Sequence, residues 1–457
     1  ESLPLAPPDK VLSTLNPDGT RRWLAPRLAK GRYWQRRRIL AYFLMLLFNV
    51  LPWIPVDGRP AMLLDVVHRE FVFFGVTSQP TETVLVVALF LSIFLTIFLL
   101  TAIFGRVWCG WGCPQTIYLE FLYRPIERLI EGKYYHKGRD AVPKGRKLLT
   151  LAVFFVVSLH LSHTFLAYFV GPHTVIEWSL GSPMDHKAGF AIVWMVTGLM
   201  VIDFASFREQ MCTLACPYGR LQSALVDPDS ITIGYDTTRG EPRGKGKRGT
   251  EKTKGLGDCV DCKLCVAVCP TGIDIRDGLQ MECVQCAECI DACDSVMDRI
   301  GLERGLVRYA SEIEFEGGKR KVLRVRTALY SVGLVAAFIA FLTFLGTRKD
   351  TLIDLLRVNN VPFIVLDDGQ VSNLVRISIE NRAEATRTYT IETVREDFAT
   401  TPPVLTLEVE PTGVGQLSFN VVTDAAIFEA GRAELELRVT DGEGFEELVG
   451  RPLLGPR

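Results

Sequence analysis

Residues 84–114 read VLVVALFLSIFLTIFLLTAIFGRVWCGWGCP. The first part, Val84–Phe104, carries no charge and has the length of a helix that spans a bilayer, which needs about 20 residues. Two thiols, Cys109 and Cys113, follow directly, and a proline comes next. A membrane helix with a pair of thiols at its end therefore forms one unit of this sequence.

That unit occurs twice. Ala188–Phe207 is a second apolar segment, and the stretch MCTLACP at residues 211–217 places Cys212 and Cys216 at the same distance from its last phenylalanine. A duplication of this kind predicts a pseudo-twofold arrangement in which the four thiols meet. The proline of each motif suits the first position of a following helix. The cysteine before it would then lie at the positive helix end, where a thiolate with a low pKa is favoured.

The composition is that of a membrane protein. The chain has 457 residues, 48% of them hydrophobic, and a mean hydropathy of +0.20, which is high for a purely soluble protein. The net charge of -1 gives no reason to expect nucleic acid as a partner. Five segments are predicted to cross the lipid bilayer: Ile39–Val56, Val84–Phe104, Leu148–Val170, Ala188–Phe207 and Thr327–Gly346.

The distribution of Lys and Arg predicts the orientation. Segments 1–38 and 105–147 carry nine Lys and Arg residues each, whereas 57–83 carries two and 171–187 carries one. Cytoplasmic loops carry the excess of these residues. We therefore expect the N-terminus and both thiol pairs on the cytoplasmic side, and the residues after Gly346 on the outer side.

Six parts are predicted along the chain. They are a cytoplasmic N-terminal segment, a four-helix membrane domain, a flexible basic linker rich in Gly, Lys and Arg, a ferredoxin domain, a fifth membrane helix and a C-terminal domain. Alternation of apolar and polar residues, as in Val375–Ile379, predicts that the last part is an antiparallel all-β sandwich. The boundaries are 1–38, 39–233, 234–257, 258–326, 327–346 and 351–457.

Eight of the twelve cysteines form two runs, each Cys-x2-Cys-x2-Cys-x3-Cys. Such short spacings indicate metal ligation by reduced thiolates rather than disulfides. The pattern is that of an α+β bacterial ferredoxin with two [4Fe-4S] clusters, in which three thiolates of a run hold one cluster and the fourth reaches the other. The predicted ligands are Cys259, Cys262, Cys265 and Cys293 for one cluster, and Cys283, Cys286, Cys289 and Cys269 for the second.

Two clusters close together pass single electrons, so the runs predict electron transfer. The first run ends in the usual proline, whereas the second has Asp294 at that place. We expect this change to loosen the turn and to alter the local potential without removing a ligand.

The four thiols of the duplicated units are the predicted catalytic and metal-binding residues: Cys109, Cys113, Cys212 and Cys216. Soft thiolates prefer Cu(I), so the two pairs could hold one or two copper ions, or another iron-sulfur centre. Disulfide exchange fits less well, because its motif is Cys-x2-Cys. The alternative without a functional role is that the four cysteines only pack as small buried side chains at the membrane edge.

His160 and His163 lie in the third predicted span, one helical turn apart and therefore on one face. Ionisable groups inside a membrane often mark functional sites, so these residues are further candidate ligands for copper or haem. Packing is the alternative, since the remaining histidines fall in loops and none faces the pair from another span. Asp203 is a lone candidate of the same kind.

The five spans, the duplicated Cys-x3-Cys-Pro motif, the inserted two-cluster ferredoxin and the sandwich together resemble the cytochrome c oxidase accessory proteins of the FixG/CcoG type. The resemblance covers essentially the whole chain. It implies an immunoglobulin-like outer domain, a place in the bacterial inner membrane, and reduction of Cu(II) to Cu(I) during assembly of the copper site of a cbb-type oxidase. Copper chaperones or oxidase assembly factors would then be partners, and the cytoplasmic electron donor stays open.

Two other classes of function fit the same features. One is a quinol-linked electron relay, as in nitrate-reduction membrane proteins that share the Cys-x3-Cys-Pro motif. The other is a non-catalytic scaffold that binds copper and the oxidase. Only the behaviour of the thiols toward copper and quinol separates these three functions.

Overall fold

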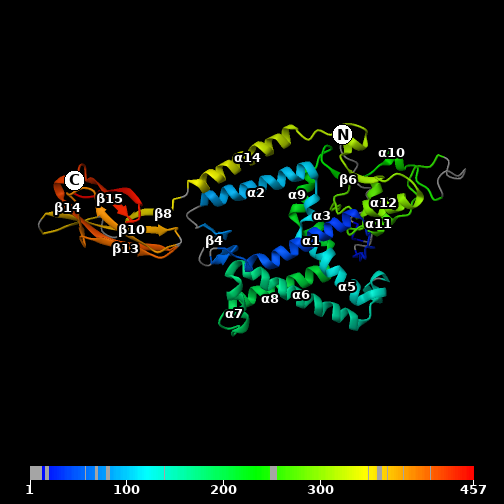
Figure 1. Cartoon of the computed structure of the whole chain (residues 1–457), viewed down its shortest axis with the longest axis horizontal. Coiled ribbons are helices and arrows are strands. Elements are labelled where there is room, and N and C mark those ends of the chain that lie inside the picture. The colour runs from blue at the N-terminus through cyan, green and yellow to red at the C-terminus, as the bar shows by residue number, and fades with distance from the viewer. Residues whose placement is uncertain are drawn as a thin grey trace. The chain divides into compact units, whose positions relative to one another are not determined.

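The computed structural model divides into two compact units, Glu1–Phe341 and Leu342–Arg457, and each is described by itself. The first holds the membrane helices and the ferredoxin part, and the second holds the β-sandwich (Figure 1). The structure describes residues 13–15, 20–56, 58–66, 70–78, 83–137, 139–246, 255–347, 349–357, 363–367, 369–383, 385–411 and 413–456.

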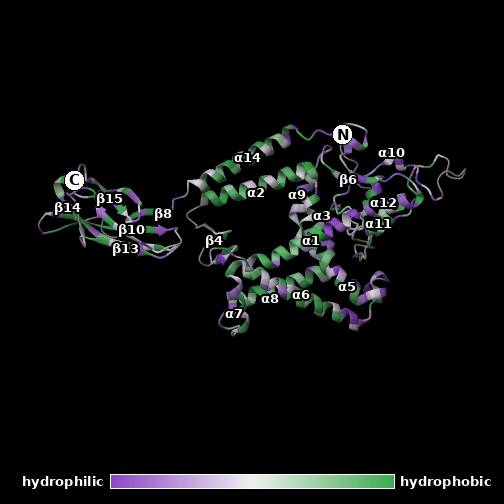
Figure 2. Ribbon diagram, in the orientation of Figure 1, coloured by the Kyte–Doolittle hydropathy of each residue, from purple (hydrophilic) through white to green (hydrophobic). Residues whose placement is uncertain are grey.

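Within the described residues, four helices are long and apolar enough to cross a membrane. Helix α2 (Thr83–Phe104) and helix α14 (Val325–Gly346) lie side by side, with the rings of Phe98 and Tyr330 5.8 Å apart. Helix α6 (Lys144–Val170) packs on α8 (Lys187–Ile202), where Thr197 Oγ1 donates to Ser162 Oγ over 3.0 Å. Figure 2 shows that all four are hydrophobic over most of their length.

The first predicted span, Ile39–Val56, is not among these four helices. Helix α1 (Arg32–Val50) begins in a cluster of arginines and ends where Pro52 opens a short 3₁₀ turn, so too little of it is apolar. It nevertheless runs beside α6, since His160 Nε2 lies 2.9 Å from Asn49 Oδ1 and the Tyr168 hydroxyl donates to the carbonyl of Phe48.

The ferredoxin part is built from short elements around its own core. Helix α11 (Leu264–Ala267) lies inside the first cysteine run, and helix α12 (Glu288–Ile300) begins inside the second. Strand β6 (Thr232–Tyr235) pairs antiparallel with β7 (Val307–Ala310). The buried side chains between them include Ile233, Ile290, Met297 and Leu306. Because β6 and β7 flank both runs in sequence, their pairing closes this part of the chain.

The predicted flexible linker 234–257 is wrong at its start. Its first two residues belong to β6, and helix α10 (Thr237–Gly240) follows, capped by the Asp236 carboxylate. Arg239 is then paired with Asp258 over 2.5 Å. Residues 234–257 lack apolar periodicity, which is the reason for the linker prediction. The pairing of β6 with β7 is made by backbone groups, so it does not require an alternating pattern of side chains. Residues 247–254 lie outside the described residues.

The second unit is an antiparallel sandwich of two sheets, as predicted from the alternating sequence. Its strands are β8 (Thr351–Arg357), β9 (Ile364–Val365), β10 (Gln370–Asn381), β11 (Arg387–Thr393), β12 (Ala399–Thr401), β13 (Leu405–Val409), β14 (Val414–Asp424), β15 (Arg432–Thr440) and β16 (Glu446–Leu454). One sheet has the order β12-β14-β10-β8 with β9 beside β10, and the other has the order β13-β11-β15-β16. Alternate residues such as Ile377, Ile379, Leu435 and Leu437 form the core between them.

Candidate electron-transfer site

The two cysteine runs share one local conformation. The residues on either side of the second cysteine of each run have positive φ. They are Asp261 (49°) and Lys263 (55°) in the first run, and Gln285 (55°) and Ala287 (65°) in the second. Alternation of this kind turns successive backbone N-H groups toward the inside of a concave loop, which suits an anionic cluster. The spacing of the cysteines therefore corresponds to a real loop shape.

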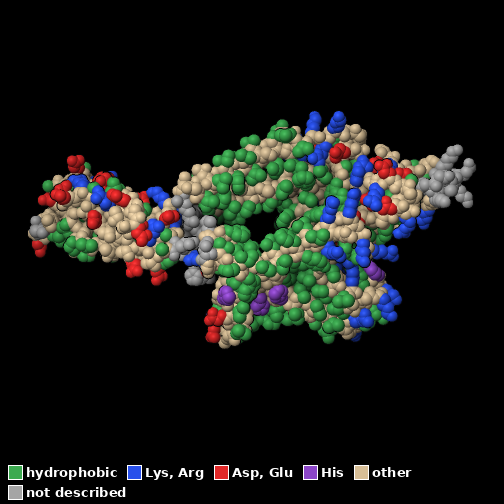
Figure 3. Space-filling view, viewed as in Figure 1, with side chains coloured by type: hydrophobic (Ala, Val, Ile, Leu, Met, Phe, Trp, Pro, Cys, Tyr) green, Lys and Arg blue, Asp and Glu red, His purple; other side chains and the backbone are tan. Residues whose placement is uncertain are grey.

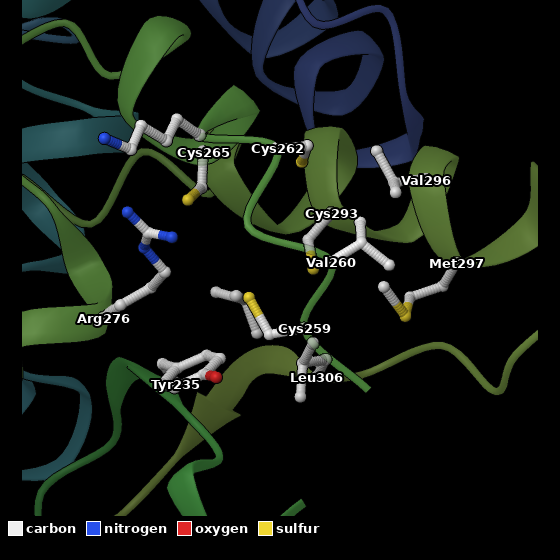
Figure 4. A pocket seen from close by; sticks show the side chains of 12 residues that line it. Tyr235, Cys259, Val260, Cys262, Cys265, Arg276, Cys293, Val296, Met297 and Leu306 are labelled. Carbon is white, nitrogen blue, oxygen red and sulfur yellow. The ribbon is translucent and has the colours of Figure 1, made fainter. Parts of the chain in front are cut away.

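The thiols predicted for one cluster line a cavity together: Cys259, Cys262, Cys265 and Cys293. Figure 4 shows the sulfurs of Cys259, Cys265 and Cys293 directed toward this cavity. Arg276 closes one side and is held by Asp261 and Asp274, each 2.6 Å from its guanidinium. Four thiols around one cavity fit a [4Fe-4S] cluster, which takes a thiolate at each iron. Cys262 is exposed, so this site reaches the surface. We name it the distal cluster site.

The thiols predicted for the second cluster line another cavity: Cys269, Cys283, Cys286 and Cys289. Cys283 and Cys286 are buried, and Thr271 Oγ1 lies 3.4 Å from the sulfur of Cys269. Cys265 of the first set also lines this cavity, so the two cluster sites are neighbours. We name this buried one the proximal cluster site, since it lies against the duplicated membrane units.

Asp294 does not loosen the end of the second run. Helix α12 continues through Cys293 and Asp294 to Ile300, because no proline interrupts it. The Asp294 carboxylate accepts a hydrogen bond from Gly305 N over 3.1 Å and lies 3.5 Å from Arg32. The residue that replaces proline therefore ties the helix to its surroundings.

The duplicated units have the same local fold. Pro114 opens helix α4 (Pro114–Tyr118) and Pro217 opens α9 (Pro217–Leu225), as expected. In each unit, the N-H of the second cysteine donates to the carbonyl of the residue before the first cysteine over 2.8 Å. Each unit also begins with a residue of positive φ, Gly105 (59°) in the first and Arg208 (53°) in the second.

The four thiols of these units lie close enough to influence one another. Burial raises the pKa of Cys109 to about 11 and that of Cys212 to about 12, and the neighbouring thiols of both units add to the rise. The pKa of Cys113 is raised too, although the N-H groups of Gln115 and Thr116 oppose the shift. The expected low pKa is therefore wrong here for Cys113, because burial outweighs the helix end. Such thiols ionise when a metal replaces their protons.

Polar side chains that no motif revealed surround the four thiols. The Cys109 thiol donates to Gln222 Oε1 over 3.0 Å, and Gln222 Nε2 donates to the Tyr218 hydroxyl over 2.6 Å. Asp203 accepts a hydrogen bond from Gln115 over 3.1 Å, so it joins the two units. The sequence carries no signal for Gln222, because its role depends on a neighbour 113 positions away.

The first unit packs directly on the proximal cluster loop. Cys109 shares a buried cluster with Val284 and Cys286. A Cβ on Gly110 would lie 2.5 Å from the carbonyl oxygen of Val284 and 2.9 Å from the amide nitrogen of Cys286. Only glycine allows this approach, which brings the two backbones into contact. The thiol motif and the cluster ligands therefore meet without an intervening side chain.

Helix α1 and an aromatic group hold this junction in place. Arg37 donates to the Gly110 carbonyl and to Glu288 of α12, both over 2.8 Å. Trp111 Nε1 donates to the Tyr309 hydroxyl over 3.1 Å, and that hydroxyl donates to the carbonyl of Gln285 over 2.8 Å. Arg37 was counted in the sequence only as a positive charge at the membrane edge, but it is almost completely buried.

The histidines do not join the thiols. His160 Nε2 is hydrogen-bonded to Asn49, and His163 Nδ1 lies 2.7 Å from the carbonyl of Leu159 in its own helix. Among the described residues, no three His, Cys, Asp or Glu side chains gather tightly enough to hold a single metal ion. Nothing in this arrangement supports the haem or copper role considered for the two histidines.

Known families cover nearly all the motif-bearing parts. A "4Fe-4S dicluster domain" matches residues 207–312, a "4Fe-4S binding domain" matches 86–133, and an "IG-like fold at C-terminal of FixG" matches 341–450. The match over 86–133 contains Cys109 and Cys113, outside the ferredoxin runs. Iron-sulfur chemistry is therefore assigned to the middle of the chain and an immunoglobulin-like fold to its end.

Three curated proteins are similar over most of their length. Protein RdxA of Cereibacter sphaeroides is 34% identical over 75% of this chain and 76% of its own. Protein RdxB of the same organism is 32% identical over 91% and 92%, and the nitrogen fixation protein FixG of Rhizobium meliloti is 31% identical over 81% and 79%. With two iron-sulfur sites, apolar helices and this terminal domain, the chain belongs to the FixG and Rdx family of membrane-associated iron-sulfur electron-transfer proteins.

Proposed function

We propose that this protein reduces Cu(II) to Cu(I) at the bacterial inner membrane and supplies the ion for assembly of the copper site of a cbb-type oxidase. The observation that carries the proposal is the junction of Cys109 with the proximal cluster loop. Soft thiols suit the reduced ion, and a neighbouring iron-sulfur cluster supplies single electrons. Copper is the substrate in this reaction.

The burial of the two cluster sites supports an order of transfer. The distal site reaches the surface at Cys262, whereas Cys283 and Cys286 of the proximal site are buried against the thiol units. We infer that a donor protein would deliver electrons at the distal site, and that the proximal site would pass them to Cu(II) held by the four thiols. One electron from the proximal site would convert one Cu(II) to Cu(I).

The charge distribution supports a cytoplasmic position for this site. In Figure 3 the Lys and Arg side chains of the compact unit Glu1–Phe341 gather at the helix ends next to the ferredoxin part, while hydrophobic side chains cover the helices. Positive charge marks the cytoplasmic side of a bacterial membrane protein. The ferredoxin part then lies in a reducing compartment, and the sandwich lies in the periplasm.

The test uses the full chain, purified anaerobically in detergent and reduced chemically. After removal of excess reductant, Cu(II) is added and Cu(I) is measured with a specific chelator. We expect about one Cu(I) for each electron stored in the protein, and loss of this reaction in Cys109→Ser and Cys216→Ser. Thr213→Ala is the matched control, because this hydroxyl donates to the backbone carbonyls of Glu209 and Gln210, just before the second motif.

The two competing functions give different results in the same preparation. Rapid oxidation of the reduced protein by a quinone, with no response to copper, would identify a quinol-linked relay. Copper binding without any change of oxidation state would identify a scaffold. Iron analysis of the cysteine variants also decides whether the four thiols hold copper in transit or a further iron-sulfur centre.

A further inference from the structure

Among the described residues, four arginines are almost fully buried, and three of them have carboxylate partners. The pairs are Arg37 with Glu288, Arg124 with Glu120 and Glu209, and Arg208 with Glu127. The fourth, Arg106, is 6% exposed and has no Asp or Glu within ion-pair distance in the described part of the chain. A buried cation without a counter-charge is strongly unfavourable, so another negative group must balance it.

The surroundings of Arg106 contain thiols in place of carboxylates. Its Nη1 donates to the carbonyl of Met281, two residues before the proximal ligand Cys283. A Cβ on Gly219 would lie 2.8 Å from Arg106 Nη2 and 2.9 Å from the carbonyl of Cys212, so the guanidinium also touches the second thiol unit. The Nε of Arg106 is buried and has no hydrogen-bond partner among the described residues.

Arg106 lies beside both sets of thiols. Its carbonyl accepts a hydrogen bond from the backbone N-H of Cys109 over 3.0 Å, and its guanidinium contacts the chain two residues before the proximal ligand Cys283. One arginine is therefore next to a ligand of the proximal cluster and to a thiol of the membrane units. Once these thiols hold metal they are thiolates, and they supply the missing negative charge.

We propose that Arg106 is the shared counter-ion of the proximal cluster and the four-thiol centre, and that its charge favours the reduced state of both. An added electron makes either centre more negative, and a fixed cation beside it lowers the energy of that state. Arg106 thus acts through its charge on the two redox centres and does not itself accept the electron. In this step a cluster at the proximal site would lose one electron and a Cu(II) ion held by the four thiols would gain it.

A comparison of the two duplicated motifs shows that the positive charge of Arg106 is not repeated in the second one. The residue three positions before the first cysteine is Arg106 in the first unit and Glu209 in the second. Glu209 is engaged by Arg124 and Arg21, over 3.1 Å and 3.4 Å. The unpaired positive charge therefore lies only in the unit whose backbone contacts the proximal cluster loop.

The experiment is a redox titration of the holoprotein, followed by electron paramagnetic resonance of the reduced clusters. In Arg106→Gln we expect the ratio of reduced to oxidised proximal cluster at a fixed potential to fall about tenfold, which is a shift of about 59 mV for one electron. Arg106→Lys keeps the charge and should shift the potential less. Arg326→Gln is the control, because Arg326 lies at the same membrane edge but contacts Asp227 and the carbonyl of Ala224.

An unchanged potential in an Arg106→Gln protein with full iron content would overturn the proposal. If that variant does not assemble its clusters, Gly219→Ala decides, since a methyl group there displaces the guanidinium and keeps the charge in the chain. A wild-type potential in Gly219→Ala would then contradict the proposal. The inference rests on the proposed function only for the four-thiol acceptor, and the titration contains no copper, so failure of copper reduction and failure of this inference are separate results.

Discussion

The ferredoxin loops and the duplicated membrane units both bring four thiols together, but they do so by different means. In the ferredoxin part, the three ligands that each run gives to its own cluster lie within seven consecutive residues, and the loop conformation itself gathers them. The membrane-edge thiols come from two motifs that begin 103 residues apart, at Cys109 and Cys212. Local chain geometry builds the first kind of site, and helix packing builds the second.

The largest expected effect comes from breaking the local site. Cys283→Ser removes a ligand of the proximal cluster, so we expect the iron content to fall by about half and electron delivery to the thiols to stop, because each cluster needs its four thiolates. Iron analysis and the resonance signal of the distal cluster measure this. A variant that kept both clusters would contradict the predicted ligand sets.

Breaking the packed site should have a narrower effect. Cys212→Ser leaves both ferredoxin loops intact, so we expect both cluster signals to persist while the reaction at the thiols is lost. Resonance spectra and the chelator assay, made on one sample, test this separation. Loss of the ferredoxin signals as well would mean that the two sites assemble together.

The pH dependence sharpens the comparison further. Burial raises the pKa of Cys109 to about 11 and that of Cys212 to about 12, so these thiols are protonated near neutral pH and must release protons when they bind a metal. The apparent affinity for Cu(I) should therefore rise about tenfold per pH unit for each proton released. Anaerobic competition with a Cu(I) chelator from pH 6 to pH 8 measures it, and a flat profile would show that these thiols are not the ligands.

The contact between the two sites can be loosened without removing a ligand. In Gly110→Ala the new methyl group meets the Val284 carbonyl at 2.5 Å, and such overpacking costs about 1–3 kcal/mol. We expect full iron content but slower reoxidation of the proximal cluster by Cu(II). Stopped-flow absorbance compares it with Gly145→Ala, where a methyl group meets nothing within 4 Å. Equal rates would argue against transfer at this contact.

The smallest effect is expected at the aromatic group of the junction. Tyr309→Phe removes the hydroxyl that links Trp111 to the carbonyl of Gln285, which should lower the free energy of unfolding by about 1 kcal/mol. Thermal unfolding of the holoprotein measures this. A larger loss, or a loss of clusters, would place Tyr309 among the residues that the proximal site needs to form.

Elements that depend on a pattern repeated over a short stretch of chain could be predicted from the sequence. Elements whose conformation depends on contacts with residues far away in the chain could not. The span Val84–Phe104 and the sandwich strands follow from periodicity and length, and they are present. The span from Ile39 lies in α1, whose arginines before Ile39 keep this helix out of the set that is apolar enough to cross a membrane, and one of them, Arg37, makes a buried ion pair that no pattern predicts. Gly234, read as linker, lies in a strand because β7 pairs with it from 74 positions away.

By itself the sequence determined the kinds of chemistry that this protein holds, since cysteine spacing, apolar length and alternating polarity are local properties of a chain. It could not show that Gly110 touches the proximal cluster loop, that Gln222 contacts Cys109, or that Arg106 is buried with no ion-pair partner among the described carboxylates. These facts depend on which surfaces meet after folding, because burial and charge balance are set by neighbours far away in sequence.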